Sequence, residues 1–307
     1  MGKPGSAIRF VWAAISLLAC ATRPGDDPAP RPDLIPRQTL FGDPARVAPG
    51  ISPDGSLLSF AAPLEGVLNL WVAPVDAPSQ ARPITRDTKR GIWQYVWAHT
   101  NRHIVYLQDV AGDENWHAYA VDLSSGEIRD LTPIAGVQAR IQHVSHRRPA
   151  QIVLAINDRD PGLHDLYLVD LDSGERTLLA RNTGYVDWIT DDEYAVRFAR
   201  SYTESGGFVL HRSSASGGWD RFLVVDPEDE RTTRPIGFDG TGDVLYMLDS
   251  RNRNTAALFA LDTRSGERRL VYEDPRADVD EVMLHPTSYA VQAASATFTR
   301  QDWAVLD

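Results

Sequence analysis

Asp165-Leu166-Tyr167-Leu168-Val169-Asp170, which leads into the turn Ser173-Gly174-Glu175, has the pattern of a strand of aliphatic and aromatic residues that ends at an acidic corner. The same pattern recurs at residues 69–76, 117–122, 221–226 and 257–262. The five corners, Asp76, Asp122, Asp170, Asp226 and Asp262, are 46, 48, 56 and 36 residues apart, and the last two spacings together are twice 46. A repeat of about 40 to 50 residues, built from short strands and Gly turns, is typical of β-propeller blades.

A second turn recurs before another strand of each repeat. In the first copy it is Ser52-Pro53-Asp54-Gly55, where we expect Pro53 to fix φ, Asp54 to accept backbone hydrogen bonds and Gly55 to take a positive φ. One segment, Tyr202 to Trp219, interrupts the pattern and is interpreted as a loop on one face or a longer hairpin. A sixth copy begins at Val279.

The repeat therefore predicts an all-β fold, a β-propeller of four-stranded blades over residues 41–307 with about six recognisable blades. No further corner or closing strand follows the sixth copy before Asp307, so we expect an incomplete propeller. The unbroken period over 307 residues favours one domain, and a hydrophobic content of 43%, with eight Trp and ten Tyr, suits strands buried between blades. A net charge of −11 argues against nucleic-acid binding, which needs clustered cations.

The N-terminus has the pattern of an export signal over residues 1–20. Lys3 and Arg9 precede an apolar run, residues 10–19, that is too short to span a bilayer. The run ends at Leu17-Leu18-Ala19-Cys20, which resembles a bacterial lipobox, and Cys20 is the only cysteine of the chain. We expect lipidation of Cys20 and a periplasmic lipoprotein held at the membrane only by its anchor, while ordinary cleavage at small residues remains the alternative. The Pro-rich residues 21–40 are predicted to be a linker.

Three motifs go beyond general propeller features. They are Asp109-Val110-Ala111-Gly112-Asp113-Glu114-Asn115, Asn157-Asp158-Arg159-Asp160-Pro161, and Ser250-Arg251 followed by Glu273-Asp274-Pro275. In this order they resemble the N-terminal propeller of the prolyl oligopeptidase family of serine peptidases, in particular its bacterial dipeptidyl and acylaminoacyl peptidases. The resemblance covers residues 47–307.

The resemblance implies a C-terminal α/β-hydrolase domain with a Ser, Asp and His triad, which this sequence does not contain. The only Gly-x-Ser is Gly50-Ile51-Ser52, and it continues into a turn instead of a nucleophile elbow. We therefore expect no catalytic residue here, and a propeller that restricts access of oligopeptides to the hydrolase domain. Family members that release dipeptides use paired glutamates, and no Glu-Glu occurs, so that specificity stays open. The alternatives are a non-catalytic periplasmic propeller lipoprotein that binds protein or cell-wall partners, and a self-sufficient propeller hydrolase with a metal or carboxylate cluster.

Other groups of reactive residues have simpler interpretations. The pairs His99 and His103, and His143 and His146, are expected to be surface or turn histidines, because strand spacing does not place both rings of a pair on one face. The corner aspartates are expected to cap turns and not to bind calcium. No metal or cofactor is predicted.

The acidic run Asp109, Asp113 and Glu114 is interpreted as a tight hairpin and not as a general acid and base. Four tryptophans could stack a ligand at a channel mouth, but aromatic residues in strands more often pack between blades. They are Trp93, Trp97, Trp116 and Trp188.

Overall fold

The computed structural model describes residues 34–42, 45–214 and 217–307. The chain divides into two compact units, Met1–Asp43 and Pro44–Asp307. The described part of the first unit contains the short helix α1 (Arg37–Phe41). The predicted signal peptide, Cys20 and most of the predicted linker lie outside the described residues. Within the described ranges, no helix has the length and apolar character needed to cross a membrane.

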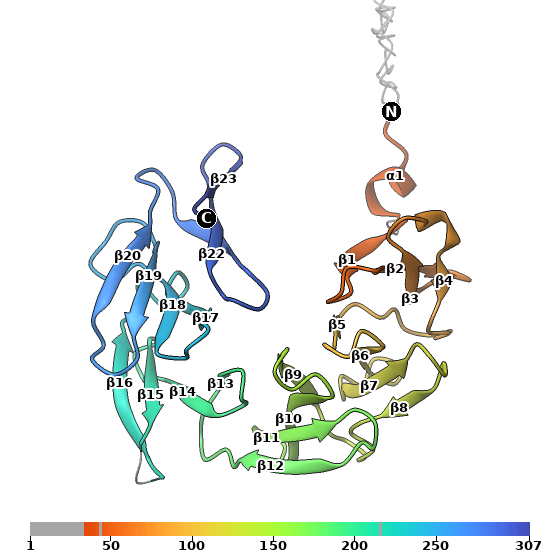
Figure 1. Cartoon of the computed structure of the whole chain (residues 1–307), viewed down its shortest axis with the longest axis horizontal. Helices are drawn as coiled ribbons and strands as arrows, with labels where there is room; N and C mark the ends of the chain where they lie inside the picture. Colours follow the sequence, from red (N-terminus) through yellow and green to blue (C-terminus); the bar gives the residue numbers. More distant parts are fainter. Residues whose placement is uncertain (1–33, 43–44, 215–216) are drawn as a thin grey trace, which may run out of the picture. The chain divides into compact units, whose positions relative to one another are not determined.

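The second unit consists of six antiparallel sheets that follow one another in chain order (Figure 1). The first three sheets each have four strands. Blade 1 contains β1 (Val47–Ile51), β2 (Leu57–Leu64), β3 (Val67–Pro74) and β4 (Arg82–Pro83), with a 3-10 turn η1 (Pro78–Gln80) before β4. Blade 2 contains β5 (Tyr95–Trp97), β6 (His103–Gln108), β7 (His117–Asp122) and β8 (Ile128–Asp130). Blade 3 contains β9 (Ala139–Val144), β10 (Gln151–Asp160), β11 (Leu163–Asp170) and β12 (Arg176–Ala180).

Two further blades have four strands, and the last sheet has three. Blade 4 contains β13 (Asp187–Thr190), β14 (Val196–Tyr202), β15 (Phe208–Ser213) and β16 (Trp219–Val225). Blade 5 contains β17 (Arg234–Phe238), β18 (Val244–Asp249), β19 (Ala257–Asp262) and β20 (Arg268–Tyr272). Blade 6 contains β21 (Val279–Leu284), β22 (Val291–Thr297) and β23 (Gln301–Val305). The predicted β-propeller with about six blades is therefore confirmed.

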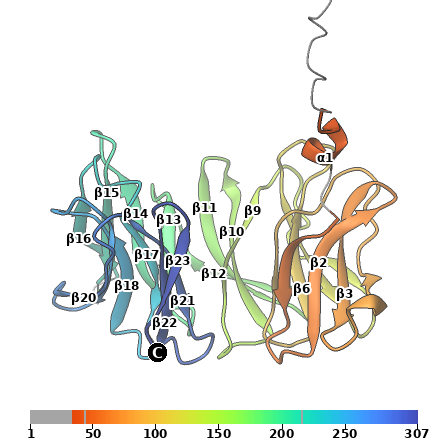
Figure 2. The ribbon, with the colours of Figure 1, turned by 90° about the horizontal axis from the view of Figure 1, so that it is seen from above.

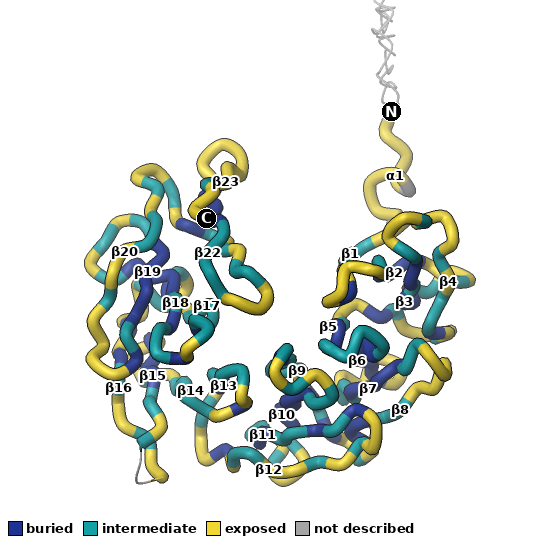
Figure 3. Tube along the Cα trace, in the orientation of Figure 1, coloured by how far each residue is buried: buried dark blue, intermediate teal, exposed yellow. Residues whose placement is uncertain are grey.

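Apolar clusters between neighbouring sheets hold the blades together. Each successive pair of blades, from blades 1 and 2 to blades 5 and 6, shares one cluster of buried side chains. Between blades 4 and 5, for example, Phe198 stacks on Phe238 at a centroid separation of 6.2 Å. Buried residues accordingly concentrate within the sheets, while turns and outer strands are exposed (Figure 3). Because a single sheet cannot cover both of its faces, this stacking supplies the core.

The repeated turns have the hydrogen bonds that their sequences predict. In Ser52-Pro53-Asp54-Gly55 the Asp54 carboxylate accepts from the Ser56 amide at 3.0 Å, and Gly55 has a φ of 74°. At the corner after β11, Asp170 Oδ1 accepts from the amides of Asp172 and Ser173 and from the Ser173 hydroxyl. Asp122 and Asp262 cap their turns in the same way. The predicted turn-capping role is therefore confirmed for Asp122, Asp170 and Asp262, whereas Asp76 and Asp226 form no such side-chain bond among the described residues.

Blade 4 corrects one detail of the predicted repeat. Residues 221–226, taken as the fourth copy of the third strand, belong to the fourth strand β16 and the residue after it. The third strand is β15, which pairs with β14 and β16 inside the segment Tyr202–Trp219, so of the two interpretations of that segment the longer hairpin is correct. Because β15 ends at Ser213 without an acidic corner, the sequence pattern of the repeat matched the next strand, β16, instead. The misassignment explains the uneven spacings of 56 and 36 residues.

Alternation of strand direction gives the propeller two distinct faces (Figure 2). The turns between the first and second strands of each blade form what we call the turn face. The loops between second and third strands, together with the connections from one blade to the next, form the opposite hairpin face. The first strands β5, β9, β13 and β17 lie toward the middle of the propeller in Figure 1, where the innermost strands of propeller blades are expected.

Candidate functional site

Three adjoining cavities follow the inner strands β9 and β13. We name them the turn-side cavity, of about 480 Å³, the aromatic cavity, of about 630 Å³, and the arginine cavity, of about 530 Å³. Gln142 and Asp187 line all three. The Gln142 amide is fixed by donating to the Trp188 carbonyl at 2.7 Å, which ties β9 to β13. Each volume is large enough for a small organic ligand or a dipeptide.

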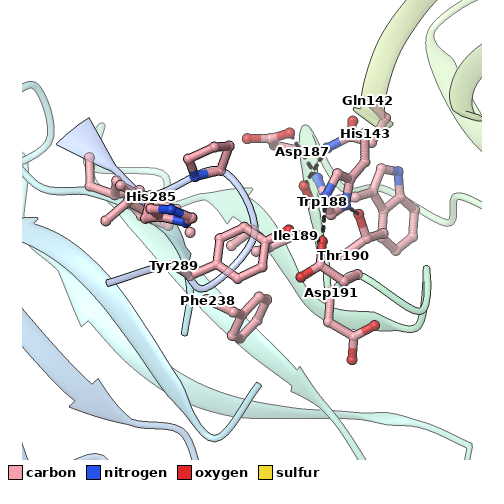
Figure 4. A pocket seen from close by; sticks show the side chains of 16 residues that line it. Gln142, His143, Asp187, Trp188, Ile189, Thr190, Asp191, Phe238, His285 and Tyr289 are labelled. Atoms are coloured by element: carbon pink, nitrogen blue, oxygen red, sulfur yellow. Dashed lines mark hydrogen bonds and ion pairs between the residues drawn. The ribbon is translucent and has the colours of Figure 1, made fainter. Parts of the chain in front are cut away.

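Side chains from several blades line the turn-side cavity (Figure 4), and a polar network joins the turns beside it. The Tyr289 hydroxyl donates to Asp192 Oδ1 at 2.7 Å, and His146 Nδ1 lies 3.0 Å from the same hydroxyl. These residues come from the first turns of blades 6, 4 and 3, respectively. Burial and then the bond to Asp192 raise the pKa of Tyr289, so the hydroxyl keeps its proton at neutral pH. Arg147 extends the network by donating to the Gly240 carbonyl of blade 5 at 2.8 Å.

The predicted histidine pairs are separated by the fold. His99 packs edge-on against His146, at a centroid separation of 6.1 Å, and not against His103. Burial and the neighbouring His146 lower the pKa of His99. His103 is not a surface or turn residue as expected, since it lies in β6 and only 2% of it is exposed. Its Nδ1 lies 3.2 Å from the Thr100 hydroxyl, which explains how a polar ring is accommodated there.

His143 lines the turn-side cavity, where its Nδ1 lies 2.8 Å from the Thr190 hydroxyl and its Nε2 3.7 Å from Asp192. Burial lowers its pKa, although the nearby aspartates oppose the shift. In the part of the chain that the structure describes, no three His, Cys, Asp or Glu residues gather as a metal site would require.

The aromatic cavity lies toward the hairpin face. Trp93 and Trp116 line it together with Gln138, Arg140 and Ile141 of the blade 3 inner edge. Trp93 is 59% exposed, so the expectation that it packs between blades is wrong. Trp97 and Trp188 are buried in interblade clusters as expected. Trp116 is partly buried and packs against the cluster between blades 2 and 3, as expected. Trp93 therefore offers the stacking surface that the sequence suggested as the less favoured use of the four tryptophans.

The arginine cavity lies between blades 3 and 4. Its charged lining residues are Arg140 on β9, Arg200 on β14 and Asp187 on β13, and His164 on β11 also contributes. Burial and the Arg140 charge lower the pKa of His164 to about 4, so this ring is neutral at pH 7. Sequence reasoning missed Arg140, Arg200, Asp192 and Tyr289. For Arg140, Asp192 and Tyr289, the signal that could have found them was their position on the first turns and inner strands, which the repeat itself defines, whereas Arg200 lies on the second strand β14.

The acidic motif of blade 2 is a structural hairpin, as expected. The Asp109 side chain is fully buried and accepts from Arg90 Nε at 3.1 Å, while Asp113 Oδ1 accepts from the amides of Val110 and Asn115. Gly112 in the turn has a φ of 87°, a backbone conformation that glycine adopts without strain. Because one carboxylate is neutralised by an arginine and the other caps backbone amides, neither is arranged as an acid and base pair.

The blade 3 motif has a comparable structural role. Arg159 forms two hydrogen bonds of 2.8 Å with the buried Asp165 carboxylate and donates to the Asn182 carbonyl. The Arg159 hydrogen bond lowers the pKa of Asp165. The Asn157 side chain accepts from the Gln138 amide at 2.6 Å, which fixes the entry to the inner strand β9. The motif thus positions the strand that carries Arg140 and Gln142.

The fold and the site define the chain as a β-propeller whose inner strands border cavities large enough for a small ligand. It is 46% identical over 276 residues to dipeptidyl aminopeptidase BIII of Pseudoxanthomonas mexicana, and the match covers 90% of this chain and 40% of that protein. It is 26% identical over 287 residues to dipeptidyl peptidase family member 6 of Caenorhabditis elegans, covering 88% of this chain and 38% of that protein. The chain thus spans about two fifths of the length of these relatives. No family model matches the chain.

Solved structures show the same fold at low sequence identity. A prolyl endopeptidase structure matches with a TM-score of 0.64 at 10% identity, over 85% of this chain and 41% of that one. The β-propeller domain of the trilobed protease from Pyrococcus furiosus matches with a TM-score of 0.54 at 14% identity, over 86% of this chain and 81% of that domain. Together with the curated relatives, they confirm what the motifs predicted: the chain resembles the propeller region of the prolyl oligopeptidase family of serine peptidases.

Proposed function

We propose that this chain is the substrate-gating propeller of an exported serine peptidase that acts on oligopeptides. The observation that carries the proposal is the 46% identity to a dipeptidyl aminopeptidase over nine tenths of the chain. In this proposal the catalytic triad belongs to a C-terminal hydrolase domain, and the propeller itself supplies no nucleophile. The channel and its three cavities admit small or extended peptides and exclude folded proteins, since each cavity has a volume of only 480 to 630 Å³.

The proposal is tested by the coding sequence and the activity of its product. We expect the reading frame beyond the codon for Asp307 to encode a Gly-x-Ser-x-Gly elbow followed by Asp and His. The full-length product should hydrolyse dipeptidyl nitroanilides and react with a fluorophosphonate probe, whereas the 307-residue chain should not react. A stop codon after Asp307 with a folded, monodisperse product would favour the binding lipoprotein instead. Labelling of a serine within the 307 residues would refute the non-catalytic role.

We also propose that the protein is lipidated at Cys20 and faces the periplasm. The supporting observation is the Leu17-Leu18-Ala19-Cys20 sequence after a basic and apolar leader. Incorporation of labelled palmitate should be lost in Cys20→Ser, while the variant is still exported. Incorporation that persists in Cys20→Ser would exclude this anchor, and a wild-type protein without lipid would indicate ordinary signal cleavage.

A further inference from the structure

Arg200 in the arginine cavity has an unsatisfied guanidinium. Only 23% of its side chain is exposed, and its Nε is buried without a hydrogen-bond partner. Its Nη2 lies 3.7 Å from Asp187 Oδ2, which is too long for a hydrogen bond. No hydrogen bond to this guanidinium occurs among the described residues. The burial of this Nε–H donor costs free energy unless an acceptor is supplied.

The rings around Arg200 hold it in place without satisfying it. The guanidinium carbon lies 5.7 Å from the centroid of Tyr202 and 5.5 Å from that of Phe208. These cation–π contacts restrict the side chain and leave its planar donors for another group. Arg251 on blade 5 shows the contrast, because it is about as buried but donates two hydrogen bonds to Asp249.

A second cation lines the same cavity. Arg140 is exposed on β9, and its Nη2 donates to Gln138 Oε1 at 3.2 Å, which leaves its other donors open to a ligand. With His164 neutral, the charged lining consists of two arginines and Asp187, a local charge of +1 in a chain with a net charge of −11. The cavity is therefore a local site of positive charge where a single anionic group is favoured.

We propose that the arginine cavity is a subsite for a carboxylate group of a peptide, with Arg200 and Arg140 as the residues that receive it. An Arg guanidinium matches a carboxylate with two parallel hydrogen bonds, which Asp187 does not form at its present distance. The adjoining aromatic cavity shares Gln138, Arg140, Gln142 and Asp187 with this one. It places the rings of Trp93 and Trp116 where an apolar side chain of the same peptide binds. The subsite thus selects peptides that carry an apolar residue next to a carboxylate.

This inference rests on the proposed function in taking a peptide as the ligand. The carboxylate belongs either to the C-terminus of the peptide or to an acidic side chain, and two peptide pairs distinguish these sources. The first pair is Ala-Phe-Ala as the free acid and as the C-terminal amide. The second pair is the amides of Ala-Phe-Glu and Ala-Phe-Gln. Binding is measured by isothermal titration calorimetry on the full-length protein after fluorophosphonate treatment, so that no peptide is hydrolysed during the titration.

We expect one pair to show an affinity about 10- to 100-fold higher for the carboxylate peptide. The advantage should disappear in Arg200→Gln, fall in Arg140→Gln and shrink at high ionic strength. Arg269→Gln is the matched control, since Arg269 is exposed on the outer strand β20 and makes no hydrogen bond through its side chain among the described residues. The two peptides without a carboxylate, Ala-Phe-Ala amide and Ala-Phe-Gln amide, should bind all four proteins equally.

Two results would overturn the subsite. One is equal binding of acid and neutral peptides by the wild type, and the other is an advantage that persists in Arg140→Gln and Arg200→Gln alike. If Arg200→Gln does not fold, Arg140→Gln decides the matter, because an exposed side chain is replaced without loss of packing. If the proposed peptidase function is wrong but the subsite is real, the result is different. The protein would then prefer the carboxylate peptide, yet without fluorophosphonate treatment it would hydrolyse none of the peptides.

Discussion

Asp249 at the end of β18 provides the sharpest stability prediction. Only 2% of its side chain is exposed, and it accepts hydrogen bonds from Arg251 Nε at 3.0 Å and Arg251 Nη2 at 2.7 Å. Arg268 Nη1 also donates to this carboxylate. One buried anion therefore pairs with two arginines whose side chains are 21% and 28% exposed. Asp249→Asn keeps the size of the side chain but removes the charge and places an NH₂ group toward these donors.

The expected cost follows from this geometry. Removal of one partner of a buried ion pair costs about 3 to 5 kcal/mol, because the remaining charges lose their compensation. The two arginines keep partial contact with water, so we place the loss for Asp249→Asn at about 3 kcal/mol. For a propeller of this size, that loss corresponds to a decrease in Tm of about 6 to 12 °C.

The assay is urea unfolding of the 307-residue chain, followed by tryptophan fluorescence, with thermal unfolding as a second measurement. Asp302→Asn is the matched control, because Asp302 pairs with Arg300 at 3.0 Å while the two side chains are 57% and 81% exposed. An exposed pair of this kind contributes about 0.5 kcal/mol or less. If Asp249→Asn were no more destabilising than Asp302→Asn, the reasoning about burial and compensation would be wrong.

The pH dependence of the same substitution is a second test. Burial alone raises the pKa of Asp249, but the Arg251 and Arg268 hydrogen bonds outweigh it and lower the pKa below its ordinary value of 3.8. The carboxylate therefore adds stability above pH 3.8, and this contribution disappears as the pH falls through the lowered pKa. The difference in free energy of unfolding between wild type and Asp249→Asn should be constant from pH 5 to 8 and shrink only below about pH 4.

Three further predictions concern other parts of the propeller. Tyr289→Phe should lower the free energy of unfolding by about 1 to 2 kcal/mol in the same urea titration, because it removes the hydroxyl that contacts both His146 and Asp192. Tyr272→Phe is the control and should be neutral, since the Tyr272 hydroxyl makes no hydrogen bond among the described residues. For His164, unfolded chains take up a proton below pH 6.5 and the folded protein only near pH 4, so stability should fall by about 1 to 2 kcal/mol across that window, and His164→Gln should reduce the fall. In Gly207→Ala the new Cβ would lie 2.2 Å from the Val225 carbonyl oxygen, so the free energy of unfolding should fall by about 2 to 3 kcal/mol in a thermal unfolding experiment. Gly218→Ala should change it little, because the nearest atom to the new Cβ is 3.6 Å away.

The fold was predictable because its determinants are local and repeated. A capped corner such as Asp170 to Gly174 needs only neighbouring residues, and Gly174 has the φ of 76° that the sequence implies. The misplaced fourth copy shows the limit of this reasoning. Since β15 ends without an acidic corner, its identity as the third strand depends on pairing with β14 and β16, and no local pattern encodes that pairing.

The site was less predictable because its contacts join distant positions. His146 and Tyr289 are 143 residues apart in sequence, and the spacing of His143 and His146 contains no information about that contact. His103 was misjudged for a related reason, since its burial depends on the packing of β6 and not on the residues beside it. By contrast, the hairpin interpretation of Asp113 was correct because its carboxylate caps amides of the same turn, although Asp109 pairs with Arg90 outside that turn.

Stability and recognition therefore depend on different positions of the repeat. Interblade packing uses the central strands together with inner-strand residues such as Trp97, Trp188 and Phe238, and the corners use their own aspartates, so neither depends on the inner-strand side chains that line the cavities. An inner strand such as β9 can then present Arg140 and Gln142 while its neighbours present other groups at no cost to the core. Arg200 goes further, because its buried Nε–H has no acceptor, which lowers stability in the absence of a ligand. A residue that destabilises the fold by itself is best explained by a ligand that supplies its missing hydrogen-bond acceptor. Ligand specificity in this propeller should therefore be sought at positions where the side chains differ between blades.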